Sequence, residues 1–289
     1  MAKSNWSKTH SLVFMALLYA FATGLGALMF WIMTSPKCGV VAPDILALLA
    51  ADLIAMLFVW IYDIIYENVS VYDPYWSFAP PVMFTLYALH KGQFTLPVVL
   101  LLLAVLCWGI RLTCNWARSF KGMGHEDWRY AGYRAKLPGT RFELLHFSGF
   151  VLMPTLLVFA CMLPGFRMWE TGAPANGITW LGFALCLAAA TIQLVADNQS
   201  HRFRAANPGQ VCNVGLWKHG RHPNYFGEIL MWWGVWTMYA SFFGLDWLVL
   251  APVAMTALFL FVSIPMMEHR QLENKPAYAE YRKSTRILL

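Results

Sequence analysis

A polar and basic segment, Gly215-Leu-Trp-Lys-His-Gly-Arg-His-Pro-Asn-Tyr-Phe-Gly-Glu228, runs directly into the apolar residues Ile229–Ala240. Pro223 has a fixed φ and no N–H group, so it suits the first turn of a helix, where that donor would have no partner. We therefore expect a membrane helix that begins near Pro223. Asn224 and Glu228 would lie on one face of this helix, because they are four residues apart.

The start of this helix combines cations with hydrogen-bonding groups. Arg221 and His222 precede it, and the N-terminus of a helix already favours an anion. Asn224, Tyr225 and Glu228 follow within the first two turns, and an amide and a carboxylate can both hydrogen bond to a carboxamide. The combination predicts a nicotinamide nucleotide, with its phosphates at the membrane surface and its ring inside the membrane.

The composition is that of an integral membrane protein. Of the 289 residues, 59% are hydrophobic and only 12% are charged, and the mean hydropathy is +0.51. Segments of about 20 apolar residues can span a bilayer, and eight candidates are residues 11–33, 44–66, 78–90, 95–117, 145–165, 177–200, 224–242 and 247–267. The sequence predicts an all-α fold, a polytopic membrane helical bundle of about eight transmembrane helices.

The basic residues predict the orientation. With eight spans both termini lie on one side, and only Lys37, Lys91 and Arg167 of the 21 basic residues fall on the opposite side. Because Lys and Arg are enriched on the cytoplasmic side of membrane proteins, we expect both termini in the cytoplasm. The net charge of +6 is then explained by topology and by contact with anionic membrane lipids. Nucleic-acid binding is not expected.

Several polar residues lie near or inside the other spans. Asp73 and Tyr75 precede the third span, where a tyrosine can donate to a carbonyl oxygen and a carboxylate can orient it. The alternative is a belt of interfacial aromatic residues. Arg111 lies about two turns inside the fourth span and needs an acidic partner or an anionic ligand. Asp52, in the second span, is either functional or paired structurally.

Two further groups are expected on the cytoplasmic face. Asp197 and Arg204 recur at helical spacing at the end of the sixth span, where they could bind a ribose hydroxyl and a phosphate, or pair with each other. Glu268 leaves the last span close to the bilayer, where Arg221 or a ligand would be its partner. Both groups would join the site predicted at the start of the seventh span.

The motifs of several cofactor and metal sites are missing. The sequence has no GxGxxG, no P-loop and no nucleophile elbow, so a nucleotide would be held by side chains at helix ends. His219 and His222 are three residues apart, but basic residues crowd them and no dense set of Cys, His and carboxylate accompanies them. We therefore expect no metal.

The run Arg221-His-Pro-Asn-Tyr-Phe-Gly-Glu228 resembles the membrane-embedded steroid 5-alpha-reductase family. It is more similar to the bacterial branch of largely uncharacterised members, the DUF1295 group. The resemblance covers roughly residues 44–289 and implies a seven-helix reductase domain there, preceded by an additional helix and loop in residues 1–43. In the wider superfamily, reductases use NADPH and methyltransferases use S-adenosylmethionine. The arrangement of Asn224, Tyr225 and Glu228 resembles the reductases.

The resemblance implies an NADPH-dependent oxidoreductase acting on CH–CH groups, similar to 3-oxo-5-alpha-steroid 4-dehydrogenases, in a bacterial inner membrane. Its lipophilic substrate would be steroid- or isoprenoid-like, with a C=C bond conjugated to a carbonyl, and no obligate protein partner is expected. Tyr75, aided by Asp73, would polarise that carbonyl. The expected nucleotide contacts are Asn224, Tyr225, Glu228, Arg221, His222, Asp197, Arg204, Arg111, Arg270 and Glu268. In the steroid enzymes a glutamate and a tyrosine hold the substrate, and their positions fall on Pro74 and Trp108.

Two other functions remain open at the level of sequence. The same scaffold supports methyl transfer from S-adenosylmethionine to a lipid. A transporter or a purely structural bundle is the other possibility, and the lack of an inverted repeat counts against a transporter.

Overall fold

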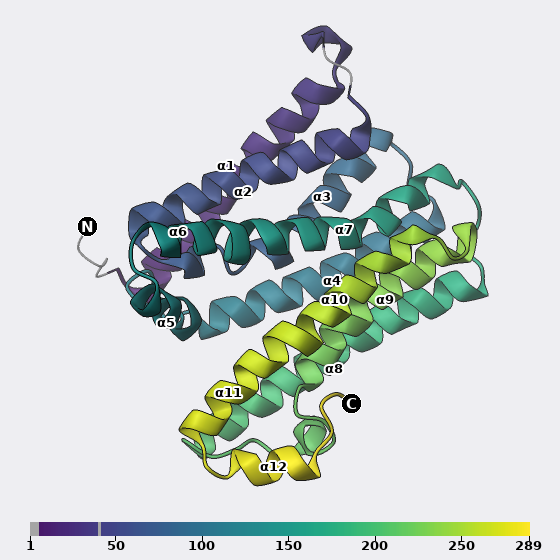
Figure 1. The fold of residues 1–289 in the computed structure, drawn as a ribbon. Coiled ribbons are helices and arrows are strands. Elements are labelled where there is room, and N and C mark those ends of the chain that lie inside the picture. The colour runs from purple at the N-terminus through teal and green to yellow at the C-terminus, as the bar shows by residue number, and fades with distance from the viewer. Residues whose placement is uncertain (1–5, 40–41) are drawn as a thin grey trace. The chain divides into compact units, whose positions relative to one another are not determined.

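The structure is a computed structural model that describes residues 6–39 and 42–289. Within these ranges the chain is helical, without any strand, and each of the eight predicted apolar segments forms a helix (Figure 1). The helices at these segments are α1 (Lys8–Thr34), α2 (Asp44–Tyr66), α3 (Tyr75–Lys91), α4 (Leu96–Ser119), α7 (Met153–Arg167), α8 (Gly177–Ala206), α9 (Pro223–Phe243) and α10 (Leu250–Leu258).

Six helical runs in the described residues are long and apolar enough to cross a membrane. They are Lys8–Thr34, Asp44–Tyr66, Leu96–Ser119, Thr140–Glu170, Gly177–Ala206 and Trp247–Asn274. Of the other two predicted spans, α3 has only 17 residues, and α9 has 21 residues but includes several Trp and Tyr. The fold is therefore a polytopic membrane helical bundle, with six clear spans where we expected about eight.

Shorter helices complete the chain. They are α5 (Trp128–Lys136), α6 (Thr140–Leu145), α11 (Ile264–Asn274) and α12 (Tyr278–Ser284). α6 continues into α7 through π-helical residues His146–Leu152, and α10 continues into α11 through Phe259–Ser263. These continuous runs explain how short helical pieces reach the length of a membrane span.

The chain divides into two compact units. The first unit consists of Met1–Gly92 and Leu112–Phe159, and the second of Gln93–Arg111 and Ala160–Leu289. In the first unit, α1 lies along α2 (Figure 1), and a Cβ atom added to Gly26 would lie 3.0 Å from the carbonyl oxygen of Ala51. Glycine therefore lets these two membrane helices approach closely.

In the second unit, glycines likewise allow α8 and α9 to pack closely. A Cβ atom on Gly182 would lie 2.6 Å from the backbone nitrogen of Met238, and one on Gly234 would lie 3.0 Å from that of Cys186. A Cβ atom on Gly227 would lie 2.9 Å from a carbonyl oxygen of α8. This contact brings the polar start of α9 against the middle of α8, where the predicted site residues lie.

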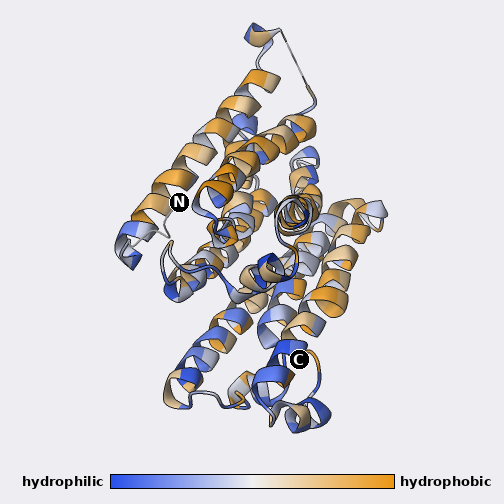
Figure 2. Cartoon of the chain, turned by 60° about the vertical axis from the view of Figure 1, so that its left-hand side comes forward, coloured by the Kyte–Doolittle hydropathy of each residue, from blue (hydrophilic) through white to orange (hydrophobic). Residues whose placement is uncertain are grey.

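The surface agrees with a membrane environment. Figure 2 shows hydrophobic residues along the long helices and hydrophilic residues gathered near the C-terminus. Large apolar side chains such as Leu17, Leu181 and Phe261 are exposed on the spans, as expected where the solvent is lipid.

Candidate functional site

The second unit contains a cavity where the C-terminal half of α8 meets the start of α9. It encloses about 690 Å³ of empty space, including the part open to solvent, and α11, α12 and the loop before α9 complete its walls. Five of the predicted nucleotide residues line it: Arg204, Arg221, His222, Asn224 and Tyr225. Because Lys275 also lines it, we call it the basic cavity.

Two cations of the basic cavity, Arg204 and Lys275, form no close ion pair with a carboxylate among the described residues. Arg204 donates from Nε to the carbonyl oxygen of Ser200 over 3.2 Å, and Lys275 donates to the carbonyl oxygen of Gln210 over 2.9 Å. Neither forms an ion pair within residues 6–39 and 42–289. Burial, together with the charge of Arg204, lowers the pKa of Lys275. An anion bound in this cavity would stabilise the charged form of Lys275 and reduce its repulsion from Arg204.

Arg221 differs from Arg204 and Lys275, because its guanidinium group forms an ion pair and joins several segments of the chain. Its Nε donates to Oε1 of Glu268 over 2.6 Å, and its Nη1 donates to the carbonyl oxygens of Arg282, over 2.9 Å, and Thr285. Arg282 pairs with the other oxygen of Glu268 over 3.0 Å. Of the two partners expected for Glu268, Arg221 or a ligand, the structure shows Arg221, and this buried ion pair shapes the wall of the cavity.

The residues after α12 form a strap against the segment before α9. The backbone N–H of Arg221 donates to the carbonyl oxygen of Arg286 over 2.9 Å, and that of His222 to Ile287 over 3.1 Å. A Cβ atom on Gly220 would lie only 2.9 Å from the backbone of Leu288. We call Arg286–Leu289 the C-terminal strap, and it fixes the backbone on which Arg221 and His222 sit.

His222 and Tyr225 form a flat aromatic pair at the start of α9. Their rings stack with centroids 5.4 Å apart and an interplanar angle of 8°. Burial lowers the pKa of His222, although Glu268, 3.3 Å from its Nε2, raises it. The net shift is downward, which favours the neutral imidazole, and a neutral imidazole can both donate and accept a hydrogen bond.

Asn224 and Asp197 connect the basic cavity to the interior of the unit. Asp197 pairs with Nη1 of Arg111 over 2.9 Å and interacts with Arg204 and the side chain of Asn224. The other terminal nitrogen of Arg111 donates to Gln193 over 2.8 Å. The acidic partner predicted for Arg111 is thus Asp197. Nε of Arg111 is buried without a partner among the described residues.

Glu228 lies deeper and does not line the basic cavity. Its carboxylate accepts hydrogen bonds from Nε1 of Trp108 over 2.9 Å, Nε2 of Gln193 over 2.7 Å and Nε1 of Trp232 over 3.2 Å. We expected this carboxylate to face a carboxamide, and three protein donors take that place. The physical reason is the close approach of α8 to α9, which presses Gln193 against Glu228. Arg270, on α11, is half-buried and also lies outside the lining.

Tyr75 and Asp73 belong to the first unit, and they do not pair with each other. The Tyr75 hydroxyl donates to Oδ1 of Asp52 over 2.7 Å. Asp73 accepts from the Tyr130 hydroxyl over 2.5 Å and pairs with Arg129 over 3.5 Å. The expectation that Asp73 orients Tyr75 is therefore wrong: α3 begins at Tyr75, and its first side chain reaches α2 while Asp73 faces α5. Burial raises the pKa of Asp73 to about 6, although Arg129 and Tyr130 lower it.

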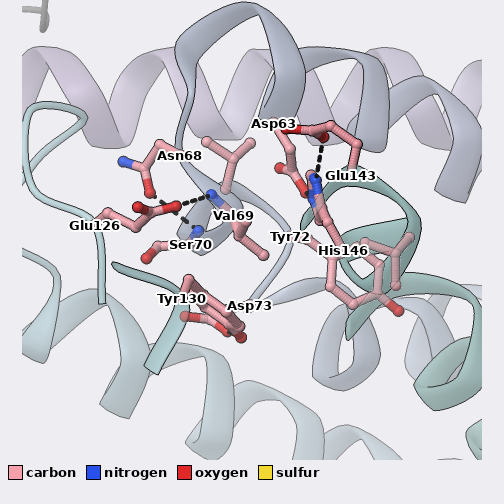
Figure 3. A network of polar contacts seen from close by, with 12 residues as sticks. Asp63, Asn68, Val69, Ser70, Tyr72, Asp73, Glu126, Tyr130, Glu143 and His146 are labelled. Atoms are coloured by element: carbon pink, nitrogen blue, oxygen red, sulfur yellow. Dashed lines mark hydrogen bonds and ion pairs between the residues drawn. The ribbon is translucent and has the colours of Figure 1, made fainter. Parts of the chain in front are cut away.

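A second polar network in the first unit was not predicted. Figure 3 shows His146 between Asp63 and Glu143, with distances of 3.1 Å and 3.2 Å from its ring nitrogens. The loop before α3 is held nearby, where the backbone N–H of Val69 donates to Glu126 over 3.2 Å. His146 is only 1% exposed, so it links Asp63 on α2 to Glu143 on α6 and is closed to a ligand. A lone histidine in an apolar run gives no sequence signal for such a role.

Comparisons with known proteins place these features in a family. The family model described as "Protein of unknown function (DUF1295)" matches residues 57–285. The "Uncharacterized protein C594.04c" of Schizosaccharomyces pombe is 23% identical over 252 residues, which cover 77% of this chain and 72% of that relative. No solved structure matches significantly. The matched region includes every residue of the basic cavity, whereas α1 and the first half of α2 precede it.

Proposed function

The chain belongs to the DUF1295 family, and we propose that it is an NADPH-dependent membrane reductase of a lipophilic substrate whose C=C bond is conjugated to a carbonyl. The observation that carries the proposal is the basic cavity at the start of α9. We place this cavity at the cytoplasmic face of a bacterial inner membrane, since the distribution of basic residues favours that orientation.

The cations of the basic cavity suit the phosphates of NADPH. Arg204 and Lys275 both line it, and neither forms an ion pair within 4.0 Å in the described parts of the chain. Guanidinium and ammonium groups bind phosphate by charge-assisted hydrogen bonds. Arg221 would support them indirectly, because its own guanidinium is committed to Glu268.

The inner end of the cavity suits the nicotinamide half. Asn224 lines the cavity and interacts with Asp197, so its amide is held in place to hydrogen bond a carboxamide. The stacked rings of His222 and Tyr225 offer a flat surface to an aromatic base. NADPH, when bound, supplies a hydride.

Glu228 has a positioning role in this proposal. It anchors Gln193 over 2.7 Å, and the same Nε2 of Gln193 also contacts the carbonyl oxygen of Asn224 over 3.3 Å. The carboxylate therefore positions the backbone of Asn224 through Gln193, and it does not contact the nicotinamide ring.

The charge of the cavity favours a polyanion over S-adenosylmethionine. The sulfonium group of S-adenosylmethionine is a cation, and an ammonium group balances its only carboxylate. Placing that molecule beside Arg204 and Lys275 would put like charges together, which costs binding energy. The basic cavity thus supports the reductase over the methyltransferase.

A thermal-shift assay of the full chain in detergent tests the proposal. Only a ligand of the folded state raises the melting temperature, so we expect a rise with NADPH and none with S-adenosylmethionine. Arg204→Gln and Lys275→Gln should each weaken NADPH binding about tenfold, as expected for the loss of one charge-assisted hydrogen bond. Arg202→Gln is the matched control, since Arg202 is an exposed neighbour on α8 outside the cavity.

Two outcomes would contradict the proposal. Stabilisation by S-adenosylmethionine alone would favour the methyltransferase. No shift with either molecule would leave the transporter or the structural bundle.

A further inference from the structure

The first unit contains a second cavity, which lies between α1, α2 and α3. It encloses about 400 Å³ including its open part. Small apolar side chains make its walls, such as Ala22 on α1, Ala55 on α2 and Ala79 on α3. No Lys, Arg or His lines it. We call it the α1–α3 cavity.

One buried carboxyl group gives the α1–α3 cavity a polar point. Asp52 lines the cavity and is only 3% exposed. Its Oδ1 accepts from the Tyr75 hydroxyl over 2.7 Å, while its Oδ2 has no partner among the described residues. Four side-chain atoms in the described chain are fully buried and lack a hydrogen-bond partner: Trp60 Nε1, Asp63 Oδ1, Arg111 Nε and Trp236 Nε1. Oδ2 of Asp52 is not one of them, so this oxygen has some accessible surface. Oδ2 therefore faces the cavity.

A carboxyl group in a membrane span needs more than one hydrogen bond. It can take part in about four, and polar groups left unsatisfied at membrane depth are expensive and usually functional. Tyr75 supplies a single donor, and no cation is present in the cavity to balance a charge. The site is thus incomplete without a further hydrogen-bonding group.

We propose that the α1–α3 cavity binds a long-chain lipid alcohol whose hydroxyl group hydrogen bonds to Oδ2 of Asp52. A hydroxyl group fits either protonation state, because it donates to a carboxylate and accepts from a carboxylic acid. A fatty acid or a phospholipid headgroup would bring a negative charge into an apolar cavity whose lining has no cation to offset it. Tyr75 acts here as a positioning residue for the carboxyl group.

The shape of the cavity suits an extended chain. Along α3 its lining runs from Tyr75 to Leu86, which is roughly 16 Å at 1.5 Å per residue. Thr23, Ala27 and Val82 at its edge are half-buried, so the cavity opens sideways between membrane helices. A lipid can therefore enter from the bilayer.

The inference stands apart from the proposed reductase. Ala22, Thr23 and Asp52 precede the region matched by the family model, and the basic cavity belongs to the other unit. A failure to bind NADPH would leave the lipid site untouched, and the reverse also holds.

Photolabelling of the full chain in detergent tests the lipid site. The probe is a hexadecanol that carries a diazirine, and the matching hexadecanoic acid serves as the comparison. We expect the alcohol to label peptides of α1 and α3, unlabelled hexadecanol to compete, and the acid to label them at least tenfold less.

Two variants remove the site in different ways. Asp52→Leu removes the carboxyl group and Ala79→Phe fills the cavity, and each should lower labelling roughly tenfold or more, as expected from the loss of a hydrogen bond to a carboxyl group or of the space for the chain. Asp44→Asn is the matched control, because Asp44 pairs at the surface with Lys91. Melting temperatures identify any variant that fails to fold, and the conclusion then rests on the other one.

The proposal is overturned if a folded Asp52→Leu protein is labelled as strongly as the parent chain. It is also overturned if the acid labels equally well, or if the label falls outside α1, α2 and α3.

Discussion

Glu228 shows how one buried side chain can organise its surroundings. Trp108, Gln193 and Trp232 all donate to it, so Glu228→Ala removes the acceptor of three buried N–H groups, although Gln193 keeps its 3.3 Å contact with the carbonyl oxygen of Asn224. Each unsatisfied donor costs about 1–3 kcal/mol, and we expect a loss of roughly 3–5 kcal/mol in the free energy of unfolding. A thermal melt without ligand should then shift downward by about 10 °C.

The control for this substitution is Glu273→Ala. The Glu273 side chain is 62% exposed, and its ion pair among the described residues is with the exposed His269, so its loss should leave the melt unchanged. A Glu228→Ala protein that melts normally but binds NADPH poorly would contradict our interpretation, since it would show that the carboxylate touches the nucleotide.

For single residues, the sequence predicted which buried charges need a partner better than it predicted which hydroxyl group meets which carboxylate. That Glu268 would meet Arg221 or a ligand, and Arg111 an acid or an anionic ligand, followed from the cost of burying a charge at a membrane helix end. The bond from Tyr75 to Asp52 did not follow, because it depends on how α3 is rotated against α2. Periodicity shows which residues share a face and does not show which neighbour that face meets.

At the scale of helices, the glycines between α8 and α9 should be sensitive to any side chain. Gly234→Val would place its Cβ atom 2.5 Å from Sγ of Cys186 and 3.0 Å from a backbone nitrogen. Because the backbone cannot move without separating the helices, we expect a loss of about 1–3 kcal/mol or more. The measurement is the melting temperature of the purified protein, together with its monodispersity.

Gly24→Val provides the comparison, because no atom lies within 4 Å of a Cβ added there. Both sites are glycines inside membrane helices, so the two substitutions differ mainly in the space available. Equal effects at Gly24 and Gly234 would show that helix propensity, and not close packing, sets the cost.

Helices were predicted well where apolar residues define them. The expected span 224–242 is found as Pro223–Phe243, and 78–90 as Tyr75–Lys91. The sixth span was expected to end at residue 200, but α8 continues to Ala206. Its last two turns are polar, so hydropathy could not reveal them. The short polar helices α5 and α12 were missed for the same reason.

At the scale of the whole molecule, cysteine labelling tests the orientation. The chain has no disulfide in its described residues, and Cys38 is exposed while Cys212 is half-buried. The positive-inside rule puts Cys38 outside and Cys212 in the cytoplasm. In intact cells, a membrane-impermeant maleimide should label a variant that keeps only Cys38, and should label one that keeps only Cys212 after permeabilisation. The reverse pattern would invert the topology.

The composition predicted that the protein is a membrane helical bundle, but it did not predict that the chain divides into two compact units. An excess of apolar residues and few charges are sufficient to predict a membrane bundle. The two units, however, share α4, which changes unit between Arg111 and Leu112, and α7, which does so between Phe159 and Ala160. Nothing in an apolar helix marks such a point, because every part of it is suited to lipid and to other helices alike.

The C-terminal strap has a consequence for how the protein is made. The carbonyl oxygens of residues 286 and 287 accept hydrogen bonds from the backbone of Arg221 and His222. When α9 has been synthesised and inserted into the bilayer, the strap that completes the wall of the basic cavity has not yet been synthesised. The spans therefore insert before the basic cavity is complete. Any ligand of this cavity can bind only late in biogenesis, after α10, α11 and the C-terminal strap have been synthesised.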